Sequence, residues 1–369
     1  MHKHFHATKD SWINSGSNTD STGIDEKDQN YGQDQILQLG KKMYNQAFNS
    51  NTRVLVQFNV DNIKTYISSS GIEIGNYSAS LRLYEANGTQ GLPASYSISV
   101  HPLTEEWDEG LGKSVDEPKT TQGCSYKYRK KSMDGGVEIE WSQGGGAYVS
   151  SSGLTATQDF NHESPDLNVN ITDILQSQLN GDTDNYGYLI RLSGSRETSI
   201  TSFEDLKYFS SNTHTIYNPK IELKYDDHVV ATGSVTGSLN ELDTTGNVDN
   251  YLYKKSFRPS YKTDEVVKFR FGARQRYITK SFSTSVQEVS GSYIPEGSGS
   301  YSIVDLATGE TVVPFSSYTT MSIDSTSPYF IQDLGGLYPQ RMYKVLVKVS
   351  QDDGTEYIYD DGFEFTLRN

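Results

Sequence analysis

The sequence predicts an all-β protein made of β-sandwiches. Apolar residues recur at every second position in many short segments, which is the period of a strand with one face in water. The composition also suits half-buried strands, because the 369-residue chain holds 26 Tyr and 32 Gly but only 34% hydrophobic residues. Many such strands without a long helical period favour a sandwich over a parallel α/β sheet.

The first part of the chain repeats this alternation. Segment 54–60 places Val54, Val56, Phe58 and Val60 on one face of an expected strand. Turns rich in Gly, Ser, Asn and Asp separate it from the segments that follow. Further strands are expected at 80–84, 96–100, 167–171, 186–192 and 220–225. One helix is expected at 172–181, with Thr172 as its N-cap and Gly181 at its end.

A change of composition predicts a domain boundary after residue 226. Residues 227–250 are rich in Gly, Thr, Asn and Asp and are expected to form a linker. Strands resume at 266–271, 299–306 and 343–349, so 251–369 is expected to form an immunoglobulin-like sandwich. Within the first domain, 1–226, the Gly-rich stretch 142–153 is expected to be a flexible excursion.

The charge, the cysteine count and the apolar runs of the sequence exclude several classes of partner and location. The net charge of -15 repels phosphate backbones, so nucleic acid is not an expected partner. Cys124 stands alone and allows no intrachain disulfide. The first ten residues have no apolar core, and no apolar run approaches the roughly 20 residues that cross a bilayer. We therefore expect no membrane partner, and a chain made in a cytosol and released by a route such as lysis.

Several segments of the first domain come in the order of a known family. The pieces are DSWINSGSNT, NYGQDQILQLG, TRVLVQFNVDNI, HPLTEEWDEG and the closing NPKIELKYDD. This arrangement resembles the DNRLRE domain, also described as a disaggregatase-type or family-96 carbohydrate-binding module, over about residues 7–226. The resemblance implies a jelly-roll-type β-sandwich. The matching positions are Tyr31, Gly32, Arg53, Phe58, Trp107, Asp108, Glu109, Pro219, Leu223 and Tyr225, whereas Asn218 stands where the family has Arg.

The combination of domains also resembles structural proteins of tailed bacteriophages. In those proteins a small immunoglobulin-like domain carries a G-x-Y-P-x-R-x-Y turn, which here reads GLYPQRMY from Gly336. The resemblance implies a non-enzymatic component of the capsid, neck or tail, assembled in the host cytoplasm and released by lysis. Its partners would be copies of itself and other virion proteins, and it would need no cofactor.

One basic stretch, 257–282, stands out in the acidic chain. On a strand, Lys268 and Arg270 share the face opposite Val267, Phe269 and Phe271. An ordinary solvated strand face is one interpretation, and a patch that docks on an acidic surface of a neighbouring subunit is the other. The candidate docking residues are Lys262, Lys268, Arg270, Arg274, Arg276 and Lys280.

The alternative function is recognition of a host-surface glycan. Trp12 and Tyr31, in segments that resemble the carbohydrate-binding family, are the rings expected to stack on a sugar. Sugar cleavage is a third hypothesis, because Glu106 and Asp108 flank Trp107. Two carboxylates that project side by side from one strand end cannot lie on both sides of a glycosidic bond. We therefore expect no enzyme and no catalytic residue, with Trp107 in the core.

Metal binding has little support in the sequence. His2, His4 and His6 would share one face of a strand and could chelate zinc, but a polar edge strand explains them equally. The acidic loops 25–30 and 181–185 lack the glycine and the terminal Glu of an EF-hand. No metal site is predicted, and a structural calcium ion in a loop stays an open alternative.

Overall fold

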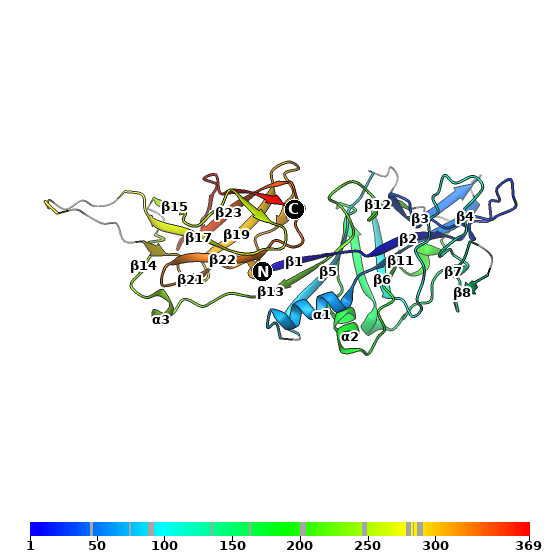
Figure 1. Cartoon of the computed structure of the whole chain (residues 1–369), viewed down its shortest axis with the longest axis horizontal. Helices are drawn as coiled ribbons and strands as arrows, with labels where there is room; N and C mark the ends of the chain where they lie inside the picture. Colours follow the sequence, from blue (N-terminus) through cyan, green and yellow to red (C-terminus); the bar gives the residue numbers. More distant parts are fainter. Residues whose placement is uncertain are drawn as a thin grey trace. The chain divides into compact units, whose positions relative to one another are not determined.

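The computed structural model describes the chain apart from residues 45–46, 74, 88–91, 134–135, 162–163, 200–203, 246–248, 278–281, 283 and 286–290. The chain splits into two compact units. The N-terminal unit is Phe5–Leu223, and the C-terminal unit is Lys224–Asn369 together with Met1–His4. Both units consist mainly of β-strands, which confirms the predicted all-β sandwich class (Figure 1).

The N-terminal unit contains strands β1 to β13, although the division between the units falls inside β1 and inside β13. The strands are β1 (His2–His6), β2 (Lys9–Asn14), β3 (Ile36–Tyr44), β4 (Ala47–Gln57), β5 (Tyr77–Leu83), β6 (Ser95–Pro102), β7 (Tyr128–Lys131), β8 (Glu138–Glu140), β9 (Ala156–Asn161), β10 (Leu167–Asn170), β11 (Tyr188–Leu192), β12 (Asp205–Phe209) and β13 (Lys220–Tyr225). The helical elements are α1 (Val60–Ser69), η1 (Ser152–Leu154), α2 (Thr172–Asn180) and η2 (Gly194–Glu197).

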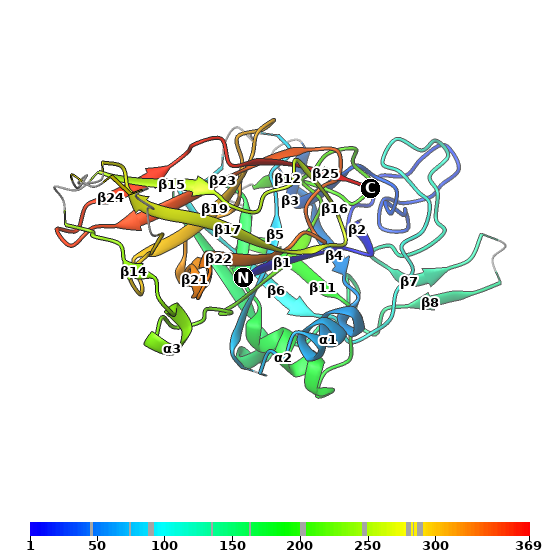
Figure 2. The ribbon, with the colours of Figure 1, turned by 60° about the vertical axis from the view of Figure 1, so that its left-hand side comes forward.

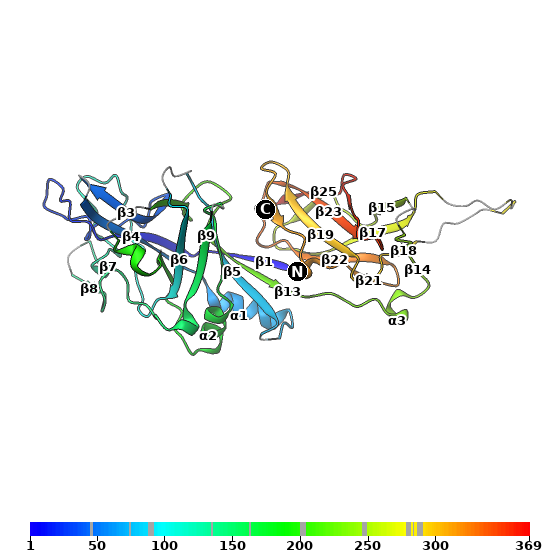
Figure 3. The ribbon, with the colours of Figure 1, turned by 180° about the vertical axis from the view of Figure 1, so that it is seen from behind.

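These strands form the layers of the first sandwich. One sheet has the order β1-β13-β5-β10. A second sheet has the order β12-β3-β4-β11-β6-β9, with β2 paired to β4. Figure 3 shows β6 and β9 side by side in this second sheet, and Figure 2 shows the separate hairpin of β7 and β8. Helices α1 and α2 contact each other (Figure 1).

The helices of this unit only partly follow the sequence prediction. The strand expected at 54–60 ends at Gln57, and Val60 instead opens α1, for which the Asn59 side chain accepts a hydrogen bond from the N–H of Asn62. The expected helix at 172–181 is present as α2 and ends at Gly181, whose positive φ of 84° suits glycine. Thr172 is its first helical residue rather than its N-cap.

The Gly-rich stretch 142–153 is anchored rather than a flexible excursion. Arg53 donates from Nη1 to the carbonyl of Gly145 at 2.6 Å, and the N–H of Gly145 donates to the carbonyl of Tyr126. Gly145 has φ +83°, and a Cβ there would lie 2.6 Å from the Tyr126 ring. The glycine is therefore required by close packing as well as by its backbone conformation.

The C-terminal unit is the second sandwich. In the described residues one sheet has the order β14-β18-β17-β22-β21, with β15 paired to β17, and another has the order β16-β25-β23-β19-β20, with β24 paired to β23. Its elements are α3 (Gly233–Thr236), β14 (Asn240–Glu241), β15 (Asn250–Lys254), β16 (Ser260–Lys262), β17 (Val266–Gln275), β18 (Ser292–Tyr293), β19 (Gly299–Asp305), β20 (Thr311–Val313), η3 (Ser317–Thr319), β21 (Ser322–Asp324), β22 (Ser327–Asp333), β23 (Met342–Ser350), β24 (Glu356–Tyr359) and β25 (Glu364–Arg368).

Aromatic rings fill the core of the C-terminal unit. Phe330 on β22 stacks on Tyr301 of β19 with ring centroids 3.7 Å apart, and on Phe269 of β17 at 5.1 Å. Residues 227–250, expected to be a linker, contain α3 and β14 and supply buried Leu242 to this core. They are therefore part of the C-terminal unit rather than a linker.

Candidate functional site

Two of the predicted docking residues are paired within the chain. Arg270 on β17 donates two hydrogen bonds to the carboxylate of Asp324, at 2.8 and 2.6 Å. Lys268, two residues earlier, lies 3.7 Å from the same carboxylate and 3.9 Å from the centroid of the Tyr329 ring. The hydrogen bonds from Arg270 hold the pKa of Asp324 well below its ordinary value. One of the two positive charges on this part of β17 is therefore neutralised within the chain.

Two other predicted docking residues, Arg274 and Arg276, lie close to one ring of a tyrosine stack. The Arg274 and Arg276 guanidinium carbons lie 5.0 and 5.7 Å from the centroid of the Tyr251 ring. Tyr251 and Tyr253 of β15 stack with centroids 5.7 Å apart. Tyr277, just beyond β17, is 78% exposed. We call Tyr251, Tyr253, Arg274, Arg276 and Tyr277 the Tyr–Arg surface.

A glycine on β17 makes room for this surface. Tyr253 pairs with Gly272 across β15 and β17, and a Cβ on Gly272 would lie 2.1 Å from the Tyr253 ring. The ring therefore lies across the glycine backbone, which fixes its orientation. Arg276 is held in addition by Asp249, with Nε 3.3 Å from the carboxylate.

The remaining predicted docking residues do not join this surface. Lys262 is exposed on β16, which pairs with β25 in the other sheet, and its backbone N–H donates to Glu265. Lys280 lies outside the described residues. The six candidates are therefore not one patch, because strand pairing separates β16 from β17.

The two predicted glycan-stacking rings are buried, so the prediction that they form an exposed platform is wrong. Trp12 is 1% exposed and Tyr31 is 2% exposed. They stack on each other at 3.8 Å between centroids, and Trp12 Nε1 donates to Asp34 at 2.8 Å. A sugar ring needs a free aromatic face, and these faces are used in the core of the N-terminal unit.

A polar cleft of about 440 Å³ lies next to these rings. Asp34 forms part of it and is fixed on both oxygens, by Trp12 on one and by the backbone N–H and hydroxyl of Ser114 on the other. Within the described residues, the amides of the three glutamines of the cleft make no hydrogen bond, so they are available to a ligand. The cleft is lined by Gln33, Asp34, Gln35, Ile36, Gln38, Lys113, Ser114 and Lys207.

The acidic stretch 103–110 follows the end of β6 and lies outside regular strands from residue 104 onward. Trp107 is fully buried, as predicted, and its ring faces the Lys9 ammonium 4.5 Å from the centroid. Asp108 pairs with Lys130 at 3.2 Å, and Glu109 accepts a hydrogen bond from the N–H of Asp10. These two carboxylates therefore have partners within the chain.

Two of the three N-terminal histidines, His2 and His4, belong to the C-terminal unit and are buried. His2 is 1% exposed, and its ring nitrogen lies 3.3 Å from the Ser316 hydroxyl. His4 is 4% exposed. Over the part of the chain that the structure describes, no group of three or more His, Cys, Asp or Glu side chains has a geometry that could hold a metal ion.

A buried charge network in the N-terminal unit could not be found from the sequence. Arg53 on β4 donates to Glu197 from Nε at 2.6 Å and from Nη2 at 3.1 Å. Arg191 on β11 pairs with the same carboxylate and donates to the Tyr148 hydroxyl. Burial lowers the pKa of neighbouring His101 to about 4, so that ring is neutral at pH 7. Arg53 and Glu197 are 144 residues apart in the sequence, which is why no local pattern reveals their contact.

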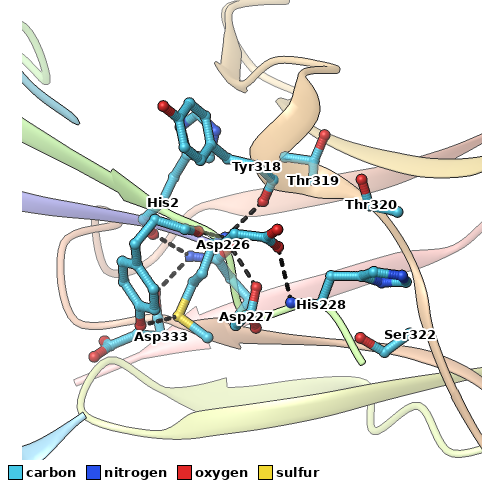
Figure 4. Close-up of polar contacts among 12 residues, drawn as sticks. His2, Asp226, Asp227, His228, Tyr318, Thr319, Thr320, Ser322 and Asp333 are labelled. Carbon is cyan, nitrogen blue, oxygen red and sulfur yellow. Dashed lines mark hydrogen bonds and ion pairs between the residues drawn. The ribbon is translucent and has the colours of Figure 1, made fainter. Parts of the chain in front are cut away.

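The N-terminal ammonium group is a second buried ionic site, and it lies within the C-terminal unit (Figure 4). The Met1 nitrogen donates to the carbonyls of Tyr225 and Tyr318, at 2.5 and 2.6 Å, and to Asp227 at 2.9 Å. Burial lowers the pKa of this ammonium group, and the charge of Asp227 partly offsets that effect. The sequence does not reveal this site, because the alternating histidines that follow Met1 are not among the groups that bind its nitrogen.

Comparisons with known proteins do not assign a family. No family model and no curated protein matches the chain. Among solved structures the chain is similar to the adhesin domain of Epf from Streptococcus pyogenes, with 7% identity, covering 98% of this chain and 92% of that one at a TM-score of 0.18. A TM-score this low carries no argument about function. In the described residues no helix is both long and apolar enough to span a membrane.

Proposed function

We propose that the chain is a non-enzymatic structural subunit that docks onto neighbouring proteins through the Tyr–Arg surface. The observation that supports this proposal is the pair of stacked tyrosines, Tyr251 and Tyr253, with Arg274 and Arg276 both close to the Tyr251 ring, on an acidic chain. Tyr and Arg are enriched among the residues that contribute most to protein interfaces. The positive charge of Arg274 and Arg276 would attract an acidic surface of a partner.

The sequence resemblance to tailed-phage proteins suggests where such a subunit would act. We propose a virion, with the chain as an accessory or adaptor protein of the capsid, neck or tail that contacts other virion proteins and copies of itself. Each copy would add the same docking surface, so that a weak contact becomes strong through repetition.

Substitution of the Tyr–Arg surface tests this proposal. The double variant Arg274→Ala, Arg276→Ala is expected to fold normally and to be incorporated into particles at least tenfold less than the natural chain. The matched control is Lys262→Ala, an exposed cation on the other sheet, which should be incorporated normally. Quantitative mass spectrometry of purified particles measures both. If the double variant were incorporated into particles as well as the natural chain, this surface would be ruled out as the docking site.

A second candidate function is binding of a host-surface glycan, and the polar cleft is the observation that favours it. Its free glutamine amides, Asp34 and two lysines offer the mixture of donors and acceptors that sugar hydroxyls require. Glycan-array binding should then be lost in the double variant Gln38→Ala, Lys207→Ala, whose residues face each other across β3 and β12. Binding that survives this change would place the glycan elsewhere on the chain.

A further inference from the structure

We propose that the outer edge of β24 (Glu356–Tyr359) binds an extended, basic segment of a partner protein, which adds to the sheet as a further strand. This edge belongs to a different sheet from the Tyr–Arg surface, and the proposal does not depend on the docking function of that surface. Addition of a peptide strand to a sheet edge is a common mode of recognition, in which main-chain hydrogen bonds give affinity and side chains give specificity.

Among the residues that the structure describes, β24 is paired on one side only. Its four residues pair with residues 347–350 of β23 (Figure 2). The following strand, β25, also pairs with β23, but β16 covers its other side. Within that part of the chain, the sheet edge is therefore closed along β25 and open along β24.

The hairpin that joins β23 to β24 fixes which backbone groups face outward. The N–H of Gln351 donates to the carbonyl of Thr355 at 2.8 Å. Hydrogen-bonded and non-hydrogen-bonded pairs alternate along an antiparallel ladder, so Tyr357, two residues after Thr355, is bonded to β23. Glu356 and Ile358 therefore direct their backbone groups away from β23. They offer two N–H donors and two carbonyl acceptors to an added strand.

The side chains of this edge do not protect it from another strand. Tyr357 is 51% exposed and Ile358 is 55% exposed. Edge strands are commonly protected by Lys, Pro or a bulge, whereas β24 reads Glu-Tyr-Ile-Tyr. The charge of Glu356 is offset by Lys348, 2.8 Å away. An added strand would cover exposed apolar surface without meeting a cation or a proline on β24.

The charge around the edge indicates a basic partner. Residues 352–361 contain five carboxylates and neither Lys nor Arg. Lys344 and Lys348 of β23 pair with two of these carboxylates. In the described part of the chain no ion pair neutralises the other three, which belong to Asp352, Asp353 and Asp361. Because like charges on adjacent strands are destabilising, the same edge of a second copy is a poor partner, and a segment with Lys or Arg fits.

A cavity of about 370 Å³ lies at one end of this edge. Gly362, which follows β24, and Pro259, which precedes β16, both line it. Phe257 and the 46% exposed Met342 add apolar wall. The cavity would accommodate an apolar side chain of the added strand, so the fitting segment alternates basic and apolar residues.

The direct test uses the full chain and two synthetic peptides. One peptide alternates Lys and Val, and the other has Glu in place of each Lys. Isothermal titration calorimetry should show that the Lys–Val peptide binds at least tenfold more tightly than the Glu–Val peptide. Equal affinity of the two peptides, or no binding of the Lys–Val peptide, would overturn the proposal.

A proline at position 358 tests the main-chain contact. The N–H of Ile358 faces away from β23, so Ile358→Pro removes an outward donor without breaking the ladder. The affinity for the Lys–Val peptide should fall at least tenfold. The matched control is Ile358→Ala, which keeps the N–H and should lose far less affinity. If the two variants bound the peptide equally well, strand addition would be excluded.

Hydrogen exchange of the natural chain locates the peptide even if the proline variant does not fold. Without peptide, the amides of Glu356 and Ile358 should exchange faster than those of Tyr357 and Tyr359, which are bonded to β23. Saturating Lys–Val peptide should slow exchange at the two outward amides at least tenfold. Unchanged exchange at these amides while the peptide is bound would place it elsewhere on the chain and contradict the proposal.

Discussion

The two units of the chain are stabilised by different kinds of interior. In the N-terminal unit, ion pairs are buried between strands and loops: Lys41 and Glu204, 3.1 Å apart, have side chains that are 0% exposed. In the C-terminal unit, the rings of Tyr301, Phe330 and Phe269 are stacked in the middle of the sandwich. Its ion pairs range from Lys348 and Glu356 at the surface to Lys3 and Asp333, which are largely buried, but none of those in the described residues lies in this ring stack.

This difference has consequences for how each unit tolerates change. A buried ion pair is strongly destabilising when one partner is removed, because the other charge stays behind without compensation. An aromatic core loses stability in proportion to the volume removed, and isosteric changes are tolerated. Loops anchored by Arg53 and Glu197 therefore depend on particular atoms, whereas the C-terminal core depends mainly on shape.

The largest expected effect comes from removing a central ring of the C-terminal unit. Phe330→Ala should lower the free energy of unfolding by about 3–5 kcal/mol, through lost burial and the cavity left behind. The three tryptophans, at 12, 107 and 141, all lie in the N-terminal unit, so their fluorescence reports that unit alone. Urea unfolding followed by circular dichroism measures the change in the other unit. A loss below about 1 kcal/mol would contradict a central role for this ring.

The next effect should come from the buried network of the N-terminal unit. Glu197→Gln leaves Arg53 and Arg191 without their common carboxylate and should cost about 3 kcal/mol. Tryptophan fluorescence during urea unfolding measures it. The control is Glu138→Gln, whose carboxylate pairs with Lys131 in contact with solvent and should contribute far less to stability. If the two variants lost similar amounts of unfolding free energy, burial would not decide how much an ion pair contributes to stability.

A smaller, pH-dependent effect is expected at Asp10. Burial raises the pKa of this carboxyl from 3.8 to about 7. The folded state therefore keeps a proton that the unfolded state has released, so stability falls as the pH rises from about 4 to about 7. This shift corresponds to roughly 4 kcal/mol, at about 1.4 kcal/mol per pKa unit.

Asp10→Asn removes the charge but weakens the hydrogen bond that the carboxylate accepts from the N–H of Ser211. The net gain at pH 8 should be about 2 kcal/mol, and it should shrink toward pH 4. Unfolding curves at several pH values measure the difference. If the gain were the same at pH 4 and pH 8, titration of Asp10 would not be its cause.

The smallest effect is expected at the partly exposed pair of the C-terminal unit. Asp324→Asn should cost about 1 kcal/mol or less, because the carboxylate and its partner Arg270 are both partly in solvent. The cost should decrease further in 1 M salt, which screens exposed charges. Urea unfolding followed by circular dichroism measures this loss of stability. A loss near 3 kcal/mol that salt does not change would indicate that the pair is buried.

The sequence predicts the strands far better than the sites. Period-two alternation identifies β23 closely, because one face of this strand is buried and the other is not. Val60 was expected in a strand because apolar spacing continues past Phe58, while Asn59 caps a helix there. Trp12 and Tyr31 are predicted to stack on a sugar because their segments resemble a carbohydrate-binding family, but both rings are buried, and a sequence motif cannot tell a buried ring from an exposed one.

Sites that depend on distant residues need the fold. Glu197 meets Arg53 only because β11 pairs with β4, and Asp227 meets Met1 from the opposite end of the sequence. The basic stretch 257–282 was predicted as one patch, but Arg274 and Lys262 belong to different sheets. Strand pairing rather than sequence distance decides which charges lie together.

We propose that this chain is a structural subunit with a docking surface at Tyr251, Tyr253, Arg274, Arg276 and Tyr277. The most direct measurement is cryo-electron microscopy of the particle with which the chain co-purifies from its native source. We expect multiple copies of the chain in a ring or lattice, with the Tyr–Arg surface of each copy buried against a neighbouring subunit. A lone monomer, or an assembly in which this surface faces solvent in every copy, would contradict it.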